Sequence, residues 1–180
     1  MSKPKRHHWW PMAQSRYWVN SGNGCVTVTR ADGSTFHANP LNIGVESELY
    51  TRFLEDDAKD TSIEEWFAET IDAPASRMVE HLLDPANVQR RSFRGRPDKE
   101  RLVKAVGFKV NPYVDWVSMP PDVRRAIADY VSALLVRHPV YLSKLSAFHR
   151  AASPSDKEAK NRALDNMLHL FEVYRQQIVK

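Results

Sequence analysis

Apolar residues recur at helical spacing over much of the second half of the chain. A spacing of three and four residues places such side chains on one face of a helix. The pattern predicts one helix over 121–138 and another that begins at Pro139, where a first helical turn tolerates proline. A last helix is predicted to follow a Ser155 cap. Its stripe is the clearest in the chain: Ala163, Leu164, Met167, Leu168, Phe171, Tyr174 and Ile178.

An earlier helix is predicted from Thr61, because Thr61-Ser62-Ile63-Glu64 has the form of a capping box and apolar residues follow at helical spacing. Pro74 falls inside this pattern, so the helix is expected to kink or split there. Residues 84–98 are interrupted by glycine and prolines and are predicted to form a basic loop. A short helix is predicted after it, over 98–108.

The N-terminal quarter shows strand and turn signals instead. β-branched and aromatic residues are separated by Ser-Gly-Asn-Gly at 21–24 and by Ala-Asp-Gly-Ser at 31–34. We therefore expect an α+β, mainly helical fold, in which a small N-terminal antiparallel β-meander (roughly 17–38) is followed by about five helices. The chain is expected to be a single domain over 1–180, with an aromatic and β-rich segment at 1–45 and a helical portion at 61–180.

Composition is consistent with that picture and excludes several classes of protein. Of the 180 residues, 42% are apolar and 27% are charged, which excludes a disordered or collagen-like chain. No apolar run approaches the roughly 20 residues of a membrane span, so no membrane partner is expected, and the basic N-terminus lacks the apolar core of a secretory signal. The lone cysteine, Cys25, fits a reducing compartment, so a cytoplasmic location is expected.

Charge is strongly segregated along the chain. The net charge is +4 overall, but residues 46–87 carry a net charge of −9 and residues 88–112 carry +6. Two arrangements are compatible with this pattern. Either the acidic and basic blocks face each other within the fold, or the basic face stays free for an anionic partner.

The basic block contains the strongest partner-binding signal. Guanidinium groups fork to phosphates, and an aromatic ring among them can stack on an unpaired base. We therefore expect a non-catalytic domain, without a cofactor, that contacts nucleic acid or another polyanion such as an acidic protein. A further alternative is a structural subunit whose acidic 46–87 surface docks a basic partner. The residues expected to contact the polyanion are Arg90, Arg91, Phe93, Arg94, Arg96 and Lys99.

The string His7-His8-Trp9-Trp10-Pro11 carries an alternative enzyme hypothesis. Adjacent imidazoles can bind a transition metal or supply a general base. Neighbours on a strand point to opposite faces, however, so only one of the two would enter a given site. The alternative is a metal-dependent, nuclease-like hydrolase that uses His7 or His8 with Glu64 or Glu65. The competing interpretation gives the histidines a structural role and expects no metal.

Taken in order, several motifs resemble an uncharacterised bacterial family with an N-terminal His-His-x-x-Pro signature. They are Lys5-Arg6-His7-His8-Trp9-Trp10-Pro11, Pro40-Leu41-Asn42-Ile43-Gly44, Tyr50, Ile63-Glu64 and Arg137-His138-Pro139. The resemblance implies a bacterial cytoplasmic protein and points to His7, His8 and Pro11 without assigning them chemistry. Members often continue into a strand-rich C-terminal part with a Ser-Asp-x-Pro motif. This chain lacks that part, so we expect either a short form or a portion of a longer protein.

Overall fold

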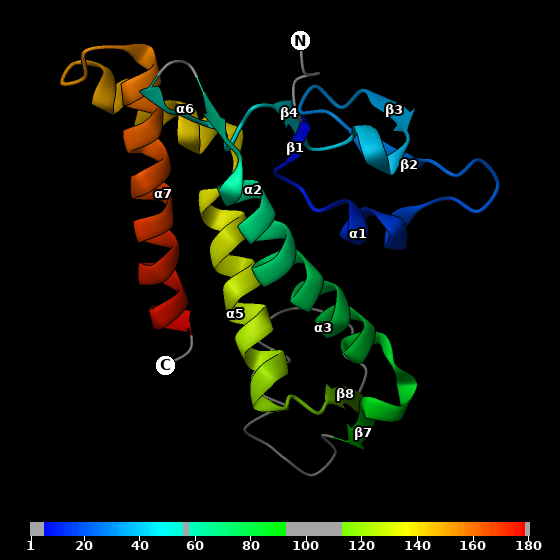
Figure 1. Ribbon diagram of the computed structural model, residues 1–180. Helices are drawn as coiled ribbons and strands as arrows, with labels where there is room; N and C mark the ends of the chain where they lie inside the picture. Colours follow the sequence, from blue (N-terminus) through cyan, green and yellow to red (C-terminus); the bar gives the residue numbers. More distant parts are fainter. Residues whose placement is uncertain (1–5, 56–57, 93–112, 179–180) are drawn as a thin grey trace.

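The computed structural model describes residues 6–55, 58–92 and 113–178. A body of helices carries an N-terminal lobe of short strands on one side and a two-stranded ribbon at one end (Figure 1). The predicted α+β, mainly helical fold is confirmed. The body consists of α2 (Ser62–Trp66), the π-helical segment η4 (Phe67–Asp72), α3 (Ala73–Leu83), α5 (Pro121–Val136), α6 (Pro139–Arg150) and α7 (Asp156–Ile178).

The strands of the described residues form separate two-stranded antiparallel sheets, which pair β1 with β4, β2 with β3, β5 with β6 and β7 with β8. A two-stranded sheet is marginally stable by itself, so each one depends on what it packs against. The strands are β1 (Arg6–His8), β2 (Val26–Thr29), β3 (Thr35–Ala38), β4 (Val45–Ser47), β5 (Arg52–Phe53), β6 (Lys59–Asp60), β7 (Val88–Ser92) and β8 (Tyr113–Val117).

The predicted N-terminal meander is a hairpin, β2–β3, closed by the turn at 31–34. Residues 17 and 18 are not in a strand as predicted; they belong to the 3₁₀ turn η1 (Arg16–Trp18), which follows the short helix α1 (Met12–Ser15). Trp18 lies 6.1 Å from Trp10, measured between ring centroids. This aromatic contact and the tight turn around Asn20, whose N–H donates to the Cys25 carbonyl oxygen at 2.8 Å, replace the expected strand.

The helices predicted for the C-terminal third are confirmed. α5 begins at Pro121, α6 begins at Pro139 and α7 runs from Asp156 to Ile178. The Ser155 cap is also present, because the Glu158 N–H donates to Ser155 Oγ at 3.1 Å. Clear periodicity and a proline or serine at the helix start were sufficient signals here.

The interruption predicted at Pro74 is a π-helical segment, η4, that joins α2 to α3. Proline has no N–H to donate and its ring crowds the carbonyl four residues before it, so the preceding turns widen. The capping box at Thr61 is not formed, since the Thr61 side chain makes no capping hydrogen bond. Asp60 Oδ1 instead accepts from the Ser62 N–H at 2.8 Å, which leaves Glu64 available for a contact with β1.

The basic stretch predicted as a loop over 84–98 contains a strand. After the 3₁₀ turn η5 (Pro85–Asn87), residues 88–92 form β7, which pairs along its whole length with β8. Val88 lies opposite Val117 and Ser92 lies opposite Tyr113. The pairing partner is rich in β-branched and aromatic residues but distant in sequence. The short helix predicted over 98–108 lies outside the described residues.

The main core fills the space between η4, α5, α6 and α7. Its members are Leu49, Tyr50, Ile63, Phe67, Ile71, Ala133, Val136, Leu142, Leu164, Met167 and Phe171. Tyr50 and Phe67 have no exposed surface, and Tyr50 brings the segment after β4 into contact with the helices. Within the part of the chain that the structure describes, no helix has the length and apolar character needed to cross a membrane.

Candidate functional site

β1 places the two adjacent histidines in different environments. His7 lies opposite Glu46 and His8 opposite Val45 in the antiparallel pairing with β4. Successive side chains on a strand point to opposite faces, and His7 has no exposed surface whereas His8 is half-buried. As the sequence suggested, the two imidazoles do not share one site.

His7 is tied to the segment that follows β4. The backbone N–H of Tyr50 donates to His7 Nδ1 at 2.9 Å, and the two rings stack with their centroids 5.7 Å apart. Nδ1 must carry a lone pair to accept this bond, so it is unprotonated in the folded protein. The same lone pair is the one a metal ion would need. These contacts support a structural role for His7.

Arg137, the residue that follows α5, is the centre of the polar contacts beneath β1. Its guanidinium is 1% exposed. Nη1 donates to Asp72 Oδ1 at 2.7 Å and Nη2 to Asp72 Oδ2 at 3.3 Å. Nε donates to Tyr50 Oη at 3.4 Å, and the guanidinium carbon lies 4.6 Å from the Phe67 ring centroid. A planar, forked donor group suits this two-pronged contact with a carboxylate.

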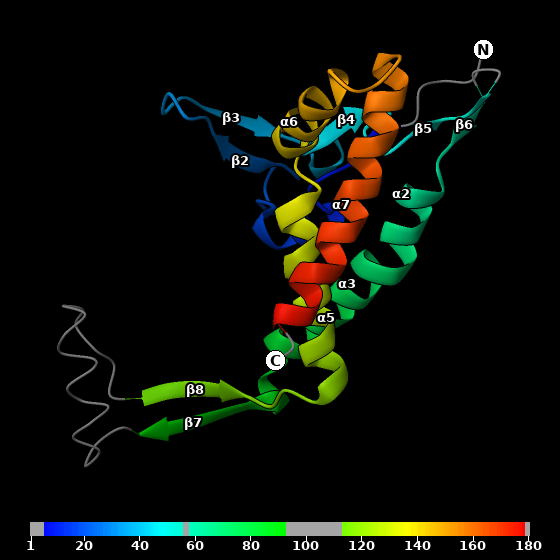
Figure 2. The ribbon, with the colours of Figure 1, turned by 90° about the vertical axis from the view of Figure 1, so that its left-hand side faces the viewer.

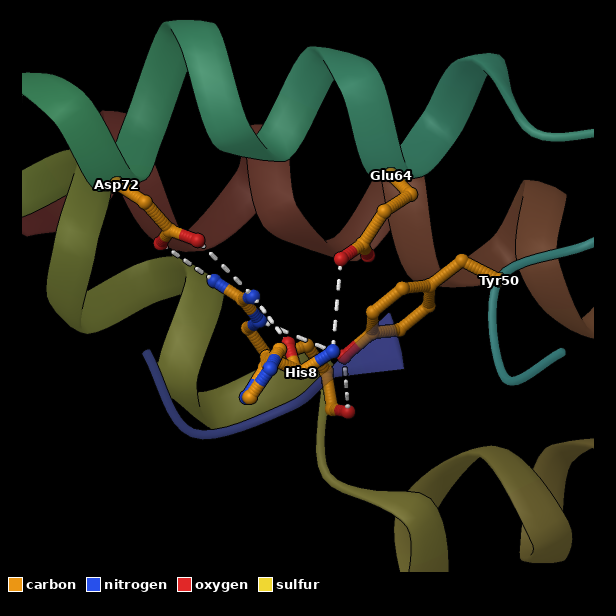
Figure 3. Close-up of polar contacts among 5 residues, drawn as sticks. His8, Tyr50, Glu64 and Asp72 are labelled. Atoms are coloured by element: carbon orange, nitrogen blue, oxygen red, sulfur yellow. Dashed lines mark hydrogen bonds and ion pairs between the residues drawn. The ribbon is translucent and has the colours of Figure 1, made fainter. Parts of the chain in front are cut away.

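The main chain of His8 completes this arrangement. Its carbonyl oxygen accepts from Arg137 Nη2 at 2.5 Å, and its N–H donates to Glu64 Oε1 at 3.4 Å. Figure 3 shows Glu64 and Asp72 pointing toward β1 from one continuous helical segment. We call this set the buried polar cluster: His7, His8, Tyr50, Glu64, Asp72 and Arg137. It holds β1 against η4 and the end of α5.

Burial and charge both act on the ionisable groups of the buried polar cluster. Burial raises the pKa of the Tyr50 hydroxyl above its usual range, so Tyr50 stays a neutral donor. Its Oη donates to the Arg137 carbonyl oxygen at 2.8 Å. Burial by itself would lower the pKa of Arg137, but Tyr50 and Asp72 raise it overall. Arg137 is therefore a permanent cation paired with a carboxylate.

The other residues of the hydrolase hypothesis do not converge on one point. Glu64 contacts the His8 main chain, whereas Glu65 is exposed and accepts from Thr61 Oγ1 at 3.3 Å. Among the described residues, no group of three or more His, Cys, Asp and Glu side chains is arranged to hold a metal ion.

Three members of the buried polar cluster were not expected to act together. Tyr50 and Arg137 appeared only as parts of the family resemblance, and Asp72 was counted only within the acidic block. A signal was nevertheless present, because Arg137 directly follows an apolar helical stripe and precedes a proline that begins the next helix. A charged residue at such a junction is a candidate for a buried ion pair.

The basic residues expected to contact a polyanion are only partly within the described chain. Arg90 and Arg91 lie on β7, where their backbones pair with Asp115 and Val114 of β8. Phe93, Arg94, Arg96 and Lys99 lie outside the described residues. Figure 2 shows β7 and β8 extending together away from the helices.

The base of this ribbon is fixed to α3. His81 Nε2 lies 2.8 Å from the Ser118 carbonyl oxygen, and Asn87 Nδ2 lies 3.3 Å from His81 Nδ1. With the proton on Nε2, both contacts are hydrogen bonds. The Ser118 N–H also donates to the Asn87 carbonyl oxygen at 3.2 Å. The ribbon therefore starts from a defined position at the ends of α3 and α5.

Several carboxylates of the acidic 46–87 block have partners from segments other than 88–112. Asp72 pairs with Arg137 at 2.7 Å and Glu80 pairs with Arg16 at 2.6 Å. Glu48 forms an ion pair with Lys59, which also belongs to the acidic block. These carboxylates are thus partly neutralised without the basic block.

The environment of His8 predicts a pH effect on stability. Burial lowers the pKa of His8 below its usual 6.5, and the positive charges of Arg6 and Arg137 add to this effect. The unfolded chain then takes up a proton near pH 6.5 that the folded protein resists. The free energy of unfolding should therefore fall as the pH drops below 6.5, and His8 should contribute no pH dependence well above it.

Urea unfolding of the wild type and of His8→Asn, at about pH 7.5 and about pH 5.5, measures this effect. We expect the wild type to lose more stability between the two conditions than His8→Asn. His169→Asn, which replaces an exposed histidine of α7, controls for the change in composition. Equal losses in the wild type and His8→Asn would show that His8 is not the source.

The chain was compared with protein-family models, curated proteins and solved structures, and no match was found in any of the three. The resemblance to the His-His-x-x-Pro family therefore remains a hypothesis.

Proposed function

We propose that this protein is a non-catalytic binding domain that contacts nucleic acid through the basic segment at and beyond β7. The observation that carries the proposal is the position of the ribbon. β7, on which the run of arginines begins, and β8 pack chiefly against each other and leave the helical body together (Figure 2). Arg90 and Arg91, which begin the basic block of net charge +6, therefore lie on a strand at one end of the described fold, and a basic block of this size attracts large anions.

The partners of the acidic block give further support. An internal pairing of the 46–87 and 88–112 blocks would require acidic side chains available to the arginines. Asp72, Glu80 and Glu48 are instead engaged with Arg137, Arg16 and Lys59. These three carboxylates are balanced by residues outside 88–112, which is compatible with the arrangement in which the basic face stays free for an anionic partner. Within this proposal the protein acts in the cytoplasm, and its bacterial origin rests on the family resemblance.

The buried polar cluster has a supporting role in the proposal. His7 accepts a hydrogen bond from the Tyr50 N–H, and the His8 carbonyl oxygen accepts one from Arg137. These hydrogen bonds hold β1 on the helices. No observation favours the nuclease-like alternative built on His7, His8, Glu64 and Glu65, and we do not adopt it.

Binding of fluorescent oligonucleotides, measured by anisotropy over a salt series, tests the proposal. The logarithm of the binding constant should fall linearly with the logarithm of the salt concentration, by about 0.9 per neutralised phosphate. Replacing Arg90, Arg91, Arg94 and Arg96 with alanine should weaken binding and reduce that slope by up to about 3.6. The expected residual slope comes from the remaining basic residues.

The matched control removes four positive charges from α6 and α7: Lys144, Arg150, Lys157 and Arg162 are replaced with alanine. Its slope should stay close to that of the wild type. Absence of binding at low salt, or equal slopes in the two four-residue variants, would overturn the proposal.

A further inference from the structure

A groove lies between α2 and the middle of α7, beside β5. It has a volume of about 460 Å³, and pockets for small molecules usually measure roughly 300–1,000 Å³. Its apolar lining includes Ile63 and Trp66 of α2 and Leu168 and Phe171 of α7. The Trp66 and Phe171 rings meet edge to face, with their centroids 5.3 Å apart. The groove therefore offers an aromatic and aliphatic surface to an apolar ligand.

Arg52 adds a polar group to the lining of this groove. It lies on β5, which is held against α7 by the side chain of Asn161. The Phe53 N–H donates to Asn161 Oδ1 at 3.0 Å, and Asn161 Nδ2 donates to the Phe53 carbonyl oxygen at 2.7 Å. Nη2 of Arg52 forms an ion pair with Asp165, also on α7. These contacts fix the position of the Arg52 guanidinium beside the groove.

The Nε atom of Arg52 is the observation that points to a ligand. Nε is buried, and no atom of residues 6–55, 58–92 or 113–178 forms a hydrogen bond with it. A buried donor without an acceptor destabilises the folded protein, and native proteins satisfy nearly all such groups. A ligand that enters the groove with an acceptor oxygen would supply the missing partner.

The charged side chains of the lining already have counterions. Arg52 pairs with Asp165, and Glu172 pairs with Arg175 at 3.3 Å. An anionic ligand would meet the carboxylates of these pairs, and a cationic ligand would meet their guanidinium groups. Moving a charge out of water without a new counterion is costly. The groove therefore favours a ligand without net charge.

We propose that this groove binds a neutral small molecule whose aromatic ring packs on Trp66 and Phe171 and whose carbonyl oxygen accepts a hydrogen bond from Arg52 Nε. Contacts between aromatic rings add to the free energy gained from burying apolar surface. The carbonyl group fixes the orientation of the ligand, as a few polar groups do in most such pockets. β5 lies toward the end of the helical body opposite β7 and β8 (Figure 2), so this site is independent of the proposed nucleic-acid contact.

The test titrates isotope-labelled protein with phenylacetamide and with ethylbenzene, which has the ring but no carbonyl group, and follows the backbone amide chemical shifts. In the wild type the shift changes should be concentrated on β5, α2 and α7. Arg52→Met keeps the apolar stem and removes the donor. It should weaken the binding of phenylacetamide about 10-fold, the effect of one hydrogen bond to a charged group, and leave the binding of ethylbenzene unchanged. The matched control is Arg162→Met, which removes an arginine of an exposed ion pair on α7 and should bind both probes as the wild type does.

Each of the other outcomes would overturn the proposal. The wild type could fail to bind phenylacetamide, the shift changes could lie away from the groove, or Arg52→Met could weaken both probes equally. Phenylacetate, the anionic analogue, should bind more weakly than the amide, and tighter binding would refute the assignment of a neutral ligand. The amide spectrum of Arg52→Met shows whether this variant folds. Arg52→Lys, which keeps the charge opposite Asp165 but has no Nε donor, should show the same selective loss.

Discussion

Replacing Arg137 with alanine is expected to lower the free energy of unfolding by about 3–5 kcal/mol, because it removes one partner of a buried ion pair. The guanidinium is almost completely buried and contacts Asp72, Tyr50 and the His8 carbonyl oxygen. After the substitution, Asp72 loses the cation that compensates its charge. The His8 carbonyl oxygen loses a donor as well, and unsatisfied buried polar groups are costly.

The location of Arg137 makes the loss larger than that of a surface pair. It connects β1 to η4 and to the end of α5, so its removal also loosens the docking of the N-terminal strand. Arg162→Ala is the matched control, since Arg162 forms an exposed pair with Glu158 one turn away in α7. Such helical surface pairs contribute about 0.3–0.5 kcal/mol.

Chemical denaturation of the two variants gives the comparison directly. Arg137→Lys, which keeps the charge but loses the forked contact, should fall between the wild type and Arg137→Ala. If Arg137→Ala is as stable as Arg162→Ala, the buried polar cluster does not hold β1 in place.

Gly44→Ala should be the most damaging glycine substitution in the N-terminal lobe, with an expected loss of about 2–5 kcal/mol. Two costs combine in this range. Gly44 has a φ of +61°, and a left-handed conformation costs an L-residue about 1–2 kcal/mol. A Cβ atom at this position would also lie 2.3 Å from the Cβ of Trp10 and 3.1 Å from its backbone nitrogen. Overpacking of this kind costs about 1–3 kcal/mol.

The close approach has a structural cause. The Gly44 carbonyl oxygen accepts from the Trp9 N–H at 2.8 Å and from the Trp10 N–H at 3.3 Å. These bonds hold the start of β4 against the chain that leaves β1. Trp10 cannot move away without breaking these hydrogen bonds. Replacing the Trp10 indole with a smaller side chain would not relieve the clash, because the Cβ atom of residue 10 would stay in place.

Two other glycines separate the two costs experimentally. Gly24 and Gly33 also have positive φ values, +66° and +83°, but a Cβ on either would meet nothing within 4 Å. Gly24→Ala and Gly33→Ala should therefore lose only the conformational term, about 1–2 kcal/mol. Thermal or urea unfolding of the three variants tests the difference, and equal losses would contradict the steric argument.

The predictable part of this protein consists of its local elements. Proline and serine positions, together with periodic apolar residues, correctly placed the starts of α5, α6 and α7 and the interruption before Pro74. Each of these signals acts over a few residues along one helix. The hairpin β2–β3 was predicted for the same reason, since its turn contains the residues that the turn requires.

The candidate site was predicted only in part. Only the alternative enzyme hypothesis grouped His7 or His8 with Glu64 or Glu65, and the contact that Glu64 makes is with the His8 main chain and not with an imidazole. The partnership of Arg137 with Asp72 was missed, because the two residues lie 65 positions apart and nothing local links them.

The order of helices, their starts and the separation of charge can all be read from neighbouring residues, because they depend on spacing and side-chain type. The pairing of β1 with β4, the ribbon formed by β7 and β8, and the burial of Arg137 depend on segments that meet only when the helices pack. Long-range contacts are decided by the total burial and hydrogen bonding of the whole fold. For this reason the sequence could point to the histidines and the arginines, while only the folded chain paired His7 and His8 of β1 with β4 and placed Arg90 and Arg91 on a strand that pairs with β8.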